Sequence, residues 1–432
     1  MTPHTLRLVS EDATSPLPRA PRTPQETGLR FSVLVELATK ALFIRGQLGL
    51  SDLVDVMKLL PTVVTPVLEF MRSEGLCEVA RGGRDGAHEF RLTDLGRVRA
   101  QDFMRRSQYA GAAPVTIEDY TRQVQAQSVA NMGVTRERLQ QAFAGIIVRE
   151  TLLEQFGAAM NSGRAIFIYG PAGSGKTYLA ERLVGLLSGD VALPYSLAVQ
   201  GEIIRVFDPL VHEPVPAAAP ATGLDRGPMV DARWVLCRRP VVMTGAELTL
   251  SMVDLEFDET TRYYVAPQQV KANNGLFILD DLGRQLVSAQ DLMNRWIVPL
   301  DRRIDFLTLH TGQKFMVPFD VIVVFSSNLK PSQLADEAFI RRLGYKIYVG
   351  HLGADAYREI LDQACRHFGI PWRDDGLDYL LERHRAESRP LLACLPRDLL
   401  GQVRDHARFD GSEPQMSPEM LAWAWENYFA RE

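Results

Sequence analysis

The hydrophobic and polar positions fall into successive patterns that divide the chain into structural regions. Residues 1–28 are rich in Pro, Thr and Arg and poor in large apolar side chains, which predicts a disordered tail. Apolar residues then recur at helical spacing to about residue 73, and at strand spacing on both sides of a glycine turn at 82–86. A further helix follows, so we expect a small domain of three helices, a hairpin and a final helix over 29–105.

The pattern changes after this first domain. Residues 106–140 have a polar start followed by helical spacing, and we interpret them as a linker. From 141 to 352, short apolar runs alternate with helix-like segments, which predicts an α/β domain with a parallel sheet. The Pro- and Ala-rich stretch 209–231 predicts a loop inserted into this domain. Residues 353–432 show helical spacing alone, so we expect a small α-helical lid.

One strand–loop–helix segment of the α/β domain carries a strong chemical signal. The apolar run 165–169 predicts a buried strand, and the loop GPAGSGKT and a helix follow it directly. Glycines let backbone N–H groups turn toward phosphate oxygens, and the start of the helix adds partial positive charge. Lys176 would reach the β- and γ-phosphates, and the Thr177 hydroxyl would bind Mg²⁺. The predicted nucleotide-binding residues are Gly170, Pro171, Ala172, Gly173, Ser174, Gly175, Lys176, Thr177 and Tyr178.

A second apolar run, 275–279, ends in two consecutive aspartates. A carboxylate at the end of a neighbouring strand can hold the Mg²⁺ ion that Thr177 also contacts. We therefore predict that Asp280 binds the metal and that Asp281 polarises the attacking water. Two aspartates after a strand are also common in turns, but their combination with a phosphate-binding loop favours chemistry. ATP and Mg²⁺ are the predicted cofactors.

Together these segments resemble the AAA+ ATPase family over about residues 140–430. GPAGSGKT matches the Walker A motif of that family, LFILDD matches Walker B, and the strand 321–328 is similar to sensor 1, with Asn328 at its polar tip. The stretch 306–315 resembles the pre-sensor-1 β-hairpin of the branch that includes MoxR-type and chelatase-type ATPases. The resemblance implies an α/β P-loop NTPase sheet of AAA+ type, a C-terminal helical lid and a catalytic role for Lys176, Asp281 and Asn328. For Asn328, a turn at the end of a strand is the alternative.

The resemblance also assigns arginines to the site. The segment 336–343 is similar to the one that carries the arginine finger, a residue that stabilises charge on the γ-phosphate of a neighbouring subunit. Arg342 ranks before Arg341 because an apolar residue follows it, although a surface helix end with two basic residues is the alternative. Segment 395–399 resembles the start of the sensor 2 helix, where Arg397 would contact the nucleotide. A salt bridge of Arg397 with a nearby aspartate is the alternative here.

The sequence departs from the family at Asp281, where most members have glutamate. Aspartate is shorter by one methylene, so the attacking water would be held less well and turnover would be slow. Two tyrosines, Tyr263 and Tyr264, are candidates for gripping a substrate chain from a pore loop. Packing within a strand is the more common role of such residues.

The N-terminal region resembles a winged-helix domain over 31–105, on the phrases SEGLCEV and HEFRLTDLGR. Between residues 30 and 99 there are ten Lys/Arg and nine Asp/Glu, and the third-helix stretch 61–70 has no Lys or Arg. Arg81 and Arg84 in the wing are the obvious phosphate contacts. A DNA-binding module needs more basic residues, so docking to a protein partner is favoured and DNA binding stays open as an alternative.

Composition adds little to these motifs. The formal charge of −5 gives no general attraction to polyanions, and no stretch is apolar enough for a membrane span or a signal peptide. The scattered cysteines indicate reduced thiols and a cytoplasmic protein; they are Cys77, Cys237, Cys365 and Cys394. Three functions are compatible with these patterns. The first is a ring-forming motor, with a hexamer favoured, that remodels a protein partner as a chaperone does. The alternatives are a DNA-associated AAA+ protein and a scaffold that is gated by ATP binding and has little turnover.

Overall fold

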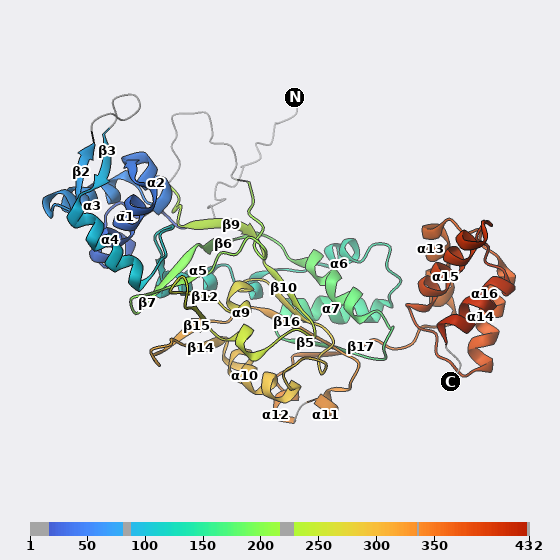
Figure 1. The fold of residues 1–432 in the computed structure, drawn as a ribbon. Coiled ribbons are helices and arrows are strands. Elements are labelled where there is room, and N and C mark those ends of the chain that lie inside the picture. Colours follow the sequence, from blue (N-terminus) through green and yellow to red (C-terminus); the bar gives the residue numbers. More distant parts are fainter. Residues whose placement is uncertain (1–16, 81–87, 217–228, 335–336, 430–432) are drawn as a thin grey trace, which may run out of the picture.

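A computed structural model describes residues 17–80, 88–216, 229–334 and 337–429 of the chain. Figure 1 shows three parts along its length: an N-terminal unit, a central α/β part and a C-terminal helical unit. None of the described helices is both long enough and apolar enough to cross a membrane.

The N-terminal unit packs its helices against a small sheet. The expected three helices, hairpin strands and final helix are present, and a short strand that was not predicted, β1, pairs with β3 in the antiparallel order β1-β3-β2. The loop between the hairpin strands, with Arg81 and Arg84, lies outside the described residues. The elements are α1 (Phe31–Arg45), β1 (Gln47–Gly49), α2 (Leu50–Met57), α3 (Pro61–Ser73), β2 (Cys77–Ala80), β3 (Glu89–Leu92) and α4 (Asp94–Arg106).

The segment that precedes this unit is ordered over its described part, contrary to the prediction of a disordered tail up to residue 28. Residues 25–27 form the 3-10 helix η1 (Gln25–Thr27), and Thr27 is buried. Arg19 forms an antiparallel bridge with Val230, and the Ala20 N–H donates to the carbonyl of Met229 at 2.8 Å. The backbone partners come from a loop some 200 residues away in the sequence, which local composition cannot reveal.

The centre of the molecule is a five-stranded parallel sheet in the order β10-β13-β16-β5-β17. Ile166 and Ile168 of β5 face a core shared with α7 and α8, while Phe167 faces a second core with α10. Because helices cover both faces, the strands are continuous apolar runs, as expected for a buried parallel sheet. The strands are β5 (Ile166–Tyr169), β10 (Val241–Thr244), β13 (Leu276–Leu279), β16 (Ile322–Ser327) and β17 (Tyr345–Tyr348).

The first three helices of the central part begin within the expected linker, 106–140. The helices of the central part are α5 (Ile117–Ala126), η3 (Val129–Asn131), α6 (Arg136–Ala142), α7 (Glu150–Ser162), α8 (Lys176–Arg182), η4 (Leu183–Leu186), η5 (Leu250–Val253), α9 (Gln268–Lys271), α10 (Ala289–Arg302), α11 (Pro331–Leu334) and α12 (Glu337–Ile340).

A second five-stranded sheet, in the order β11-β12-β8-β7-β4, lies beside the N-terminal unit and was not predicted. Two strand pairs complete the central part, and one of them, β14–β15, is the hairpin expected near 306–315. Residues 217–228 of the expected inserted loop lie outside the described residues. The strands are β4 (Val115–Thr116), β6 (Asp190–Pro194), β7 (Ser196–Val199), β8 (Glu202–Arg205), β9 (Trp234–Arg238), β11 (Glu256–Asp258), β12 (Tyr263–Val265), β14 (Ile304–Thr308) and β15 (Lys314–Pro318).

The two candidate gripping tyrosines both belong to β12, which is the more common role that the sequence analysis gave for such residues. Tyr264 is 1% exposed, and its hydroxyl accepts the backbone N–H of His310 at 2.9 Å. Tyr263 is half-buried, and its ring packs edge-on against Tyr109 at 5.6 Å between centroids. Aromatic residues favour strands because they pack on pleated surfaces, and that preference decides here.

The C-terminal unit is helical throughout its described residues, as expected. Its helices enclose a core of their own that includes Tyr357, Leu399 and Trp425. They are α13 (Ala354–Phe368), α14 (Asp374–Ala386), α15 (Leu395–Asp410) and α16 (Pro418–Tyr428).

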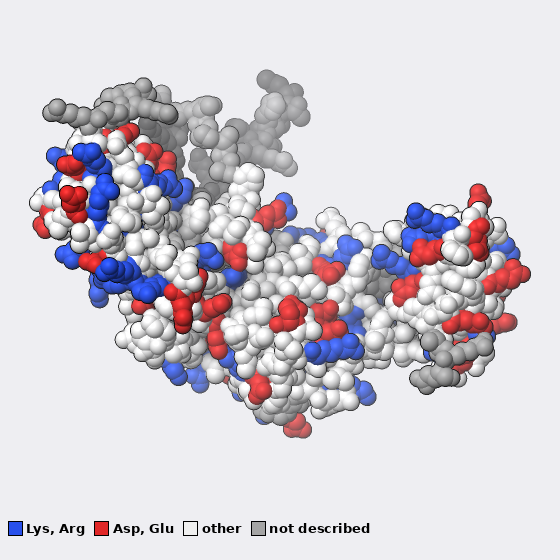
Figure 2. Space-filling model, viewed as in Figure 1, with Lys and Arg blue, Asp and Glu red and all other residues white. Residues whose placement is uncertain are grey.

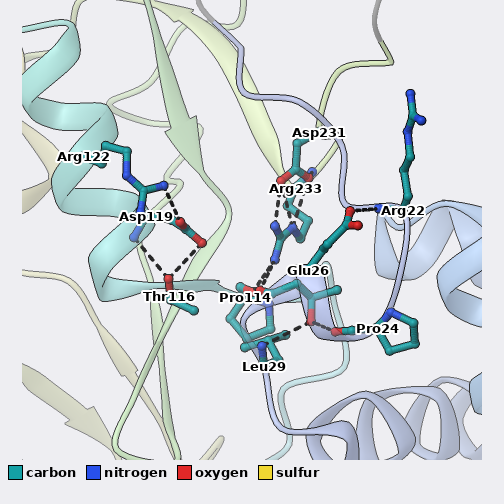
Figure 3. Close-up of polar contacts among 11 residues, drawn as sticks. Arg22, Pro24, Glu26, Leu29, Pro114, Thr116, Asp119, Arg122, Asp231 and Arg233 are labelled. Atoms are coloured by element: carbon teal, nitrogen blue, oxygen red, sulfur yellow. Dashed lines mark hydrogen bonds and ion pairs between the residues drawn. The ribbon is translucent and has the colours of Figure 1, made fainter.

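A buried arginine, held in an ion pair, joins the N-terminal segment to the central part (Figure 3). The side chains of Asp231 and Arg233 are 3% and 4% exposed, and Arg233 Nη2 lies 2.7 Å from Asp231 Oδ2. Arg233 Nη1 also donates to the carbonyls of Thr27 and Pro114, each at 3.2 Å. The guanidinium therefore fastens together three chain segments: the one that precedes α1, the linker before α5, and the end of the inserted loop.

This pair generates a stability prediction. Asp231→Ala leaves Arg233 buried without its carboxylate, so we expect the free energy of unfolding to fall by about 3–5 kcal/mol in urea denaturation. Glu78→Ala is the control, because Glu78 pairs with Arg91 and both side chains are at least half exposed; its loss should stay below about 1 kcal/mol. Equal losses in the two variants would show that the buried pair contributes no more than a surface pair.

Candidate nucleotide-binding site

The carboxyl ends of three parallel strands bring the predicted site residues together. α8 begins at Lys176 after the loop that follows β5, Asp280 and Asp281 follow β13, and Asn328 follows β16. The sequence analysis expected Asp280 to follow a strand adjacent to β5. That expectation is wrong, because β16 lies between β5 and β13 in the sheet. Asn328 is thereby placed between the loop and the two aspartates.

Thr177 and Asp280 meet directly. The Thr177 hydroxyl lies 3.0 Å from Oδ1 and 2.8 Å from Oδ2 of Asp280. Hydroxyl and carboxylate oxygens are ligands suited to Mg²⁺, which usually binds one or two carboxylates and takes its other ligands from water and substrate phosphates. Among the described residues, no group of three or more His, Cys, Asp or Glu side chains could hold a metal. The Thr177–Asp280 pair thus fits a magnesium ion that arrives with a phosphate ligand.

Lys176 is buried and lies in a polar network. Its Nζ donates to Asn328 Oδ1 at 2.7 Å and to the carbonyl of Pro171 at 2.9 Å. Asn328 Nδ2 in turn donates to Asp281 Oδ1 at 3.4 Å. Burial lowers the pKa of Lys176, while the carboxylates of Asp281 and Asp280 oppose that shift. The amide of Asn328 therefore connects the lysine with the predicted water-polarising aspartate.

The loop between β5 and α8 depends on its glycines. Gly173 and Gly175 have φ values of 78° and 89°, a region that favours glycine. A Cβ on Gly170 would lie 2.0 Å from the carbonyl oxygen of Val349, so no other residue fits there. The Ser174 hydroxyl is buried and has no hydrogen-bond partner among the described residues. A buried hydroxyl without a partner costs free energy, so this position suits a polar ligand.

The remaining predicted nucleotide contact of the loop helix is Tyr178. Its side chain is half exposed, and its hydroxyl accepts a hydrogen bond from Arg182 Nη2 at 2.7 Å. Tyr178 thus contacts the next turn of α8.

The C-terminal unit reaches the loop at the start of α15. The Cys394 N–H donates to the carbonyl of Gly173 at 3.1 Å, and a Cβ on Gly173 would lie 2.6 Å from Cys394 Sγ. Arg397 lies in the first turn of α15 and is exposed. Two aspartates near it in the sequence contact other residues: Asp398 accepts from the Tyr428 hydroxyl, and Asp405 pairs with Arg404.

The predicted arginine fingers, Arg341 and Arg342, lie at the amino-terminal ends of the parallel strands, opposite the end that carries the loop. They follow α12 and precede β17, whose first residue donates from Tyr345 N to the carbonyl of Ala165 at 3.2 Å. Since the four residues of β5 separate this edge from the loop, the two sites are roughly 13 Å apart or more. Arg341 and Arg342 line a cavity of about 270 Å³ with Arg164, Leu300 and Asp301. Asp336 of the predicted segment lies outside the described residues.

Two residues at the site were missed by sequence reasoning. Cys394 was predicted only to be one of four reduced thiols, but its backbone contacts the loop at Gly173. Gln285 follows Asp281 by four residues and binds the backbone carbonyls of both aspartates. The sequence signal for Gln285 is its place in the short polar turn after Walker B, whereas no local signal indicates Cys394.

The contact at Gly173 yields a second prediction. Gly173→Ala and Gly189→Ala both place a side chain in the left-handed region, which costs roughly 1–2 kcal/mol, but Gly189 has no atom within 4 Å of the added Cβ. We expect Gly173→Ala to lower the thermal stability further, because it also displaces Cys394. Adding Cys394→Ala should remove the excess loss. Equal losses from the two alanine variants would contradict the contact.

Residues 353–427, the four-helix C-terminal unit, match a family described as a domain of unknown function, DUF8689. No curated protein has a sequence that matches this chain. The structure of NtrX from Brucella abortus in complex with ADP is similar at 13% identity and a TM-score of 0.41, over 78% of this chain and 67% of that one. The RuvB Holliday junction branch migration motor from Thermotoga maritima is similar at 13% identity and a TM-score of 0.36, over 68% of this chain and 70% of that one.

Proposed function

We propose that the protein is an ATPase of the AAA+ type that binds Mg²⁺ and ATP at residues 170–177 and uses hydrolysis to remodel or assemble a macromolecular partner. The observation that carries the proposal is the connected set of contacts at the end of the phosphate loop. Thr177 contacts Asp280, and Lys176 reaches Asp281 through Asn328. A fold that needed only a glycine turn here would gain nothing by burying Lys176 beside a pair of carboxylates.

Each residue then has a chemical task. Lys176 leaves its contacts with Asn328 and Pro171 to bind the β- and γ-phosphates, and Ser174 donates its hydroxyl to a phosphate oxygen. Thr177 and Asp280 hold Mg²⁺, which neutralises charge on the phosphate oxygens when it is bound. Asp281 orients a water that attacks the γ-phosphorus, so the bond to the β–γ bridging oxygen breaks and ADP and phosphate leave.

The position of Arg341 and Arg342 favours a nucleotide site that is completed by a second copy of the chain. Because Arg341 and Arg342 lie at the far edge of their own sheet, they can act only on the nucleotide of a neighbour. Arg342 is the preferred finger, and a closed ring, with a hexamer favoured, gives every site such a neighbour. Arg397 would report the state of the nucleotide to the C-terminal unit as a lid.

The N-terminal unit, which we propose is a winged helix, suits a protein partner better than DNA. Its third helix, α3, carries one basic side chain, Arg72, and one acidic side chain, Glu69. On the face of this unit that Figure 2 shows, both Lys/Arg and Asp/Glu side chains are present. DNA binding needs a group of phosphate-neutralising side chains, so docking to a protein is the better-supported role. In this proposal, the docked protein is the partner that the ATPase remodels, as a chaperone does.

The proposed activity predicts magnesium-dependent ATP binding and phosphate release. Lys176→Ala should weaken ATP binding by at least tenfold in calorimetry, whereas Lys314→Ala, which removes an exposed lysine of β15, should not. Asp281→Ala should retain ATP and lose most phosphate release, because the water is no longer oriented. Normal turnover by Asp281→Ala would remove the aspartate from the mechanism. Binding without turnover by the unaltered protein would select the ATP-gated scaffold.

A mixing experiment tests whether sites form between subunits. Arg342→Ala alone should bind ATP normally and lose about 10³-fold or more in turnover, the size of an arginine-finger effect. When it is mixed with Lys176→Ala subunits, some sites combine an intact phosphate loop with an intact arginine, so activity should reappear. No recovery in mixed oligomers would move the role to Arg341 or remove it, and Arg341→Ala in the same mixture separates these outcomes.

A further inference from the structure

The backbone of the turn after β13 has an unusual conformation at the predicted water-polarising residue. Asp281 has a φ of 49°, in the left-handed region that non-glycine residues rarely adopt, and Gly283 has a φ of 104°. Such a conformation persists only where the surrounding contacts hold it, and it is often found at functional sites. The contacts that hold this turn therefore decide where the Asp281 carboxylate points.

One side chain binds the turn from within. Gln285 Nε2 donates to the carbonyls of Asp280 at 2.9 Å and of Asp281 at 3.3 Å, and it lies 3.3 Å from the carbonyl of Gly245. Gln285 Oε1 accepts the N–H of Gly283 at 2.8 Å. A single amide group thus satisfies both ends of the turn and connects it to the loop after β10.

The other side of the turn is fastened to β16. The Ser327 hydroxyl donates to the carbonyl of Leu282 at 2.7 Å, and the Leu282 N–H donates to the carbonyl of Ser326 at 2.8 Å. β16 also leads directly to Asn328, whose amide contacts Asp281. The turn is therefore held between Gln285 and the strand that supplies the partner of Asp281.

We propose that Gln285 is a positioning residue that fixes the Asp281 carboxylate for orienting the attacking water, an inference that rests on the proposed ATPase function. The chemistry of the contacts explains why glutamine stands here. Three of its four contacts are with carbonyl oxygens, which require a donor. A glutamate of the same size has no donor when ionised, so it would repel all three carbonyls and release the turn.

A structural role and a positioning role predict different measurements. If Gln285 only stabilised the fold, its replacement would lower thermal stability and ATP affinity together. If it positions Asp281, ATP affinity stays near normal while the rate of the chemical step falls. A misplacement of about 1 Å at a catalytic group can cost on the order of 100-fold in rate.

The experiment compares Gln285→Glu and Gln285→Met with the control Gln290→Glu in the full-length protein. Gln290 is exposed on α10 and contacts Asn294. We expect both Gln285 variants to bind Mg²⁺–ATP within threefold of the unaltered protein and to lose 10- to 100-fold in single-turnover hydrolysis. The control should keep the normal rate. Normal hydrolysis by Gln285→Glu would overturn the proposal.

A second arm tests whether Gln285 acts through Asp281. In the Asp281→Ala background, Gln285→Glu should cause no further loss of rate, because the group it positions is gone. An equal loss in both backgrounds would show that Gln285 acts independently of Asp281. Failure of the ATPase function itself looks different, because the unaltered protein would then either lack Mg²⁺–ATP binding or bind Mg²⁺–ATP and show no hydrolysis.

Discussion

The contact between Thr177 and Asp280 joins two strands that do not pair with each other. β5 and β13 are separated by β16, so the hydroxyl and the carboxylate meet only because all three strands are parallel and end at the same edge. That alignment depends on apolar residues buried on both faces of the sheet, such as Phe167, Phe277 and Phe325. A shift of one residue in any of these registers would exchange the two faces and separate the pair. The core of the sheet is therefore also what fixes the distances in the site.

The site combines groups that are unfavourable to bury one at a time. A lysine, two aspartates and a hydroxyl without a partner lie at the end of an apolar sheet, and burial disfavours the charged form of Lys176. Their mutual contacts offset part of that cost, but the Ser174 hydroxyl is not satisfied by any described residue. Polar groups that are held in place before a ligand arrives need no reorganisation when it binds. The arrangement is thus costly for folding and favourable for holding a charged ligand.

Local sequence patterns predicted the parts of the fold that depend on local chemistry. The glycine-rich loop between β5 and α8, the aspartates after an apolar run, the hairpin near 306–315 and the helical C-terminal unit all have short-range signals, and each of these elements is present. The failures share a different cause. The ordered segment 17–28, the sheet that contains Tyr264 and the placement of β16 between β5 and β13 all depend on partners far along the chain. The contact of Gln285 with the aspartate carbonyls was missed for a related reason, since it depends on a left-handed turn that composition alone does not indicate.

The two ends of the molecule are attached to the central part in different ways. The N-terminal unit shares its hydrophobic core with Ile203 and Tyr263 of the central part, and the buried pair of Asp231 and Arg233 reinforces that attachment. The C-terminal unit has a core of its own, formed only by residues after 351, and touches the phosphate loop through Cys394. The C-terminal unit therefore meets the loop at Gly173 by direct contact, whereas the N-terminal unit is fixed to the central part by a shared core.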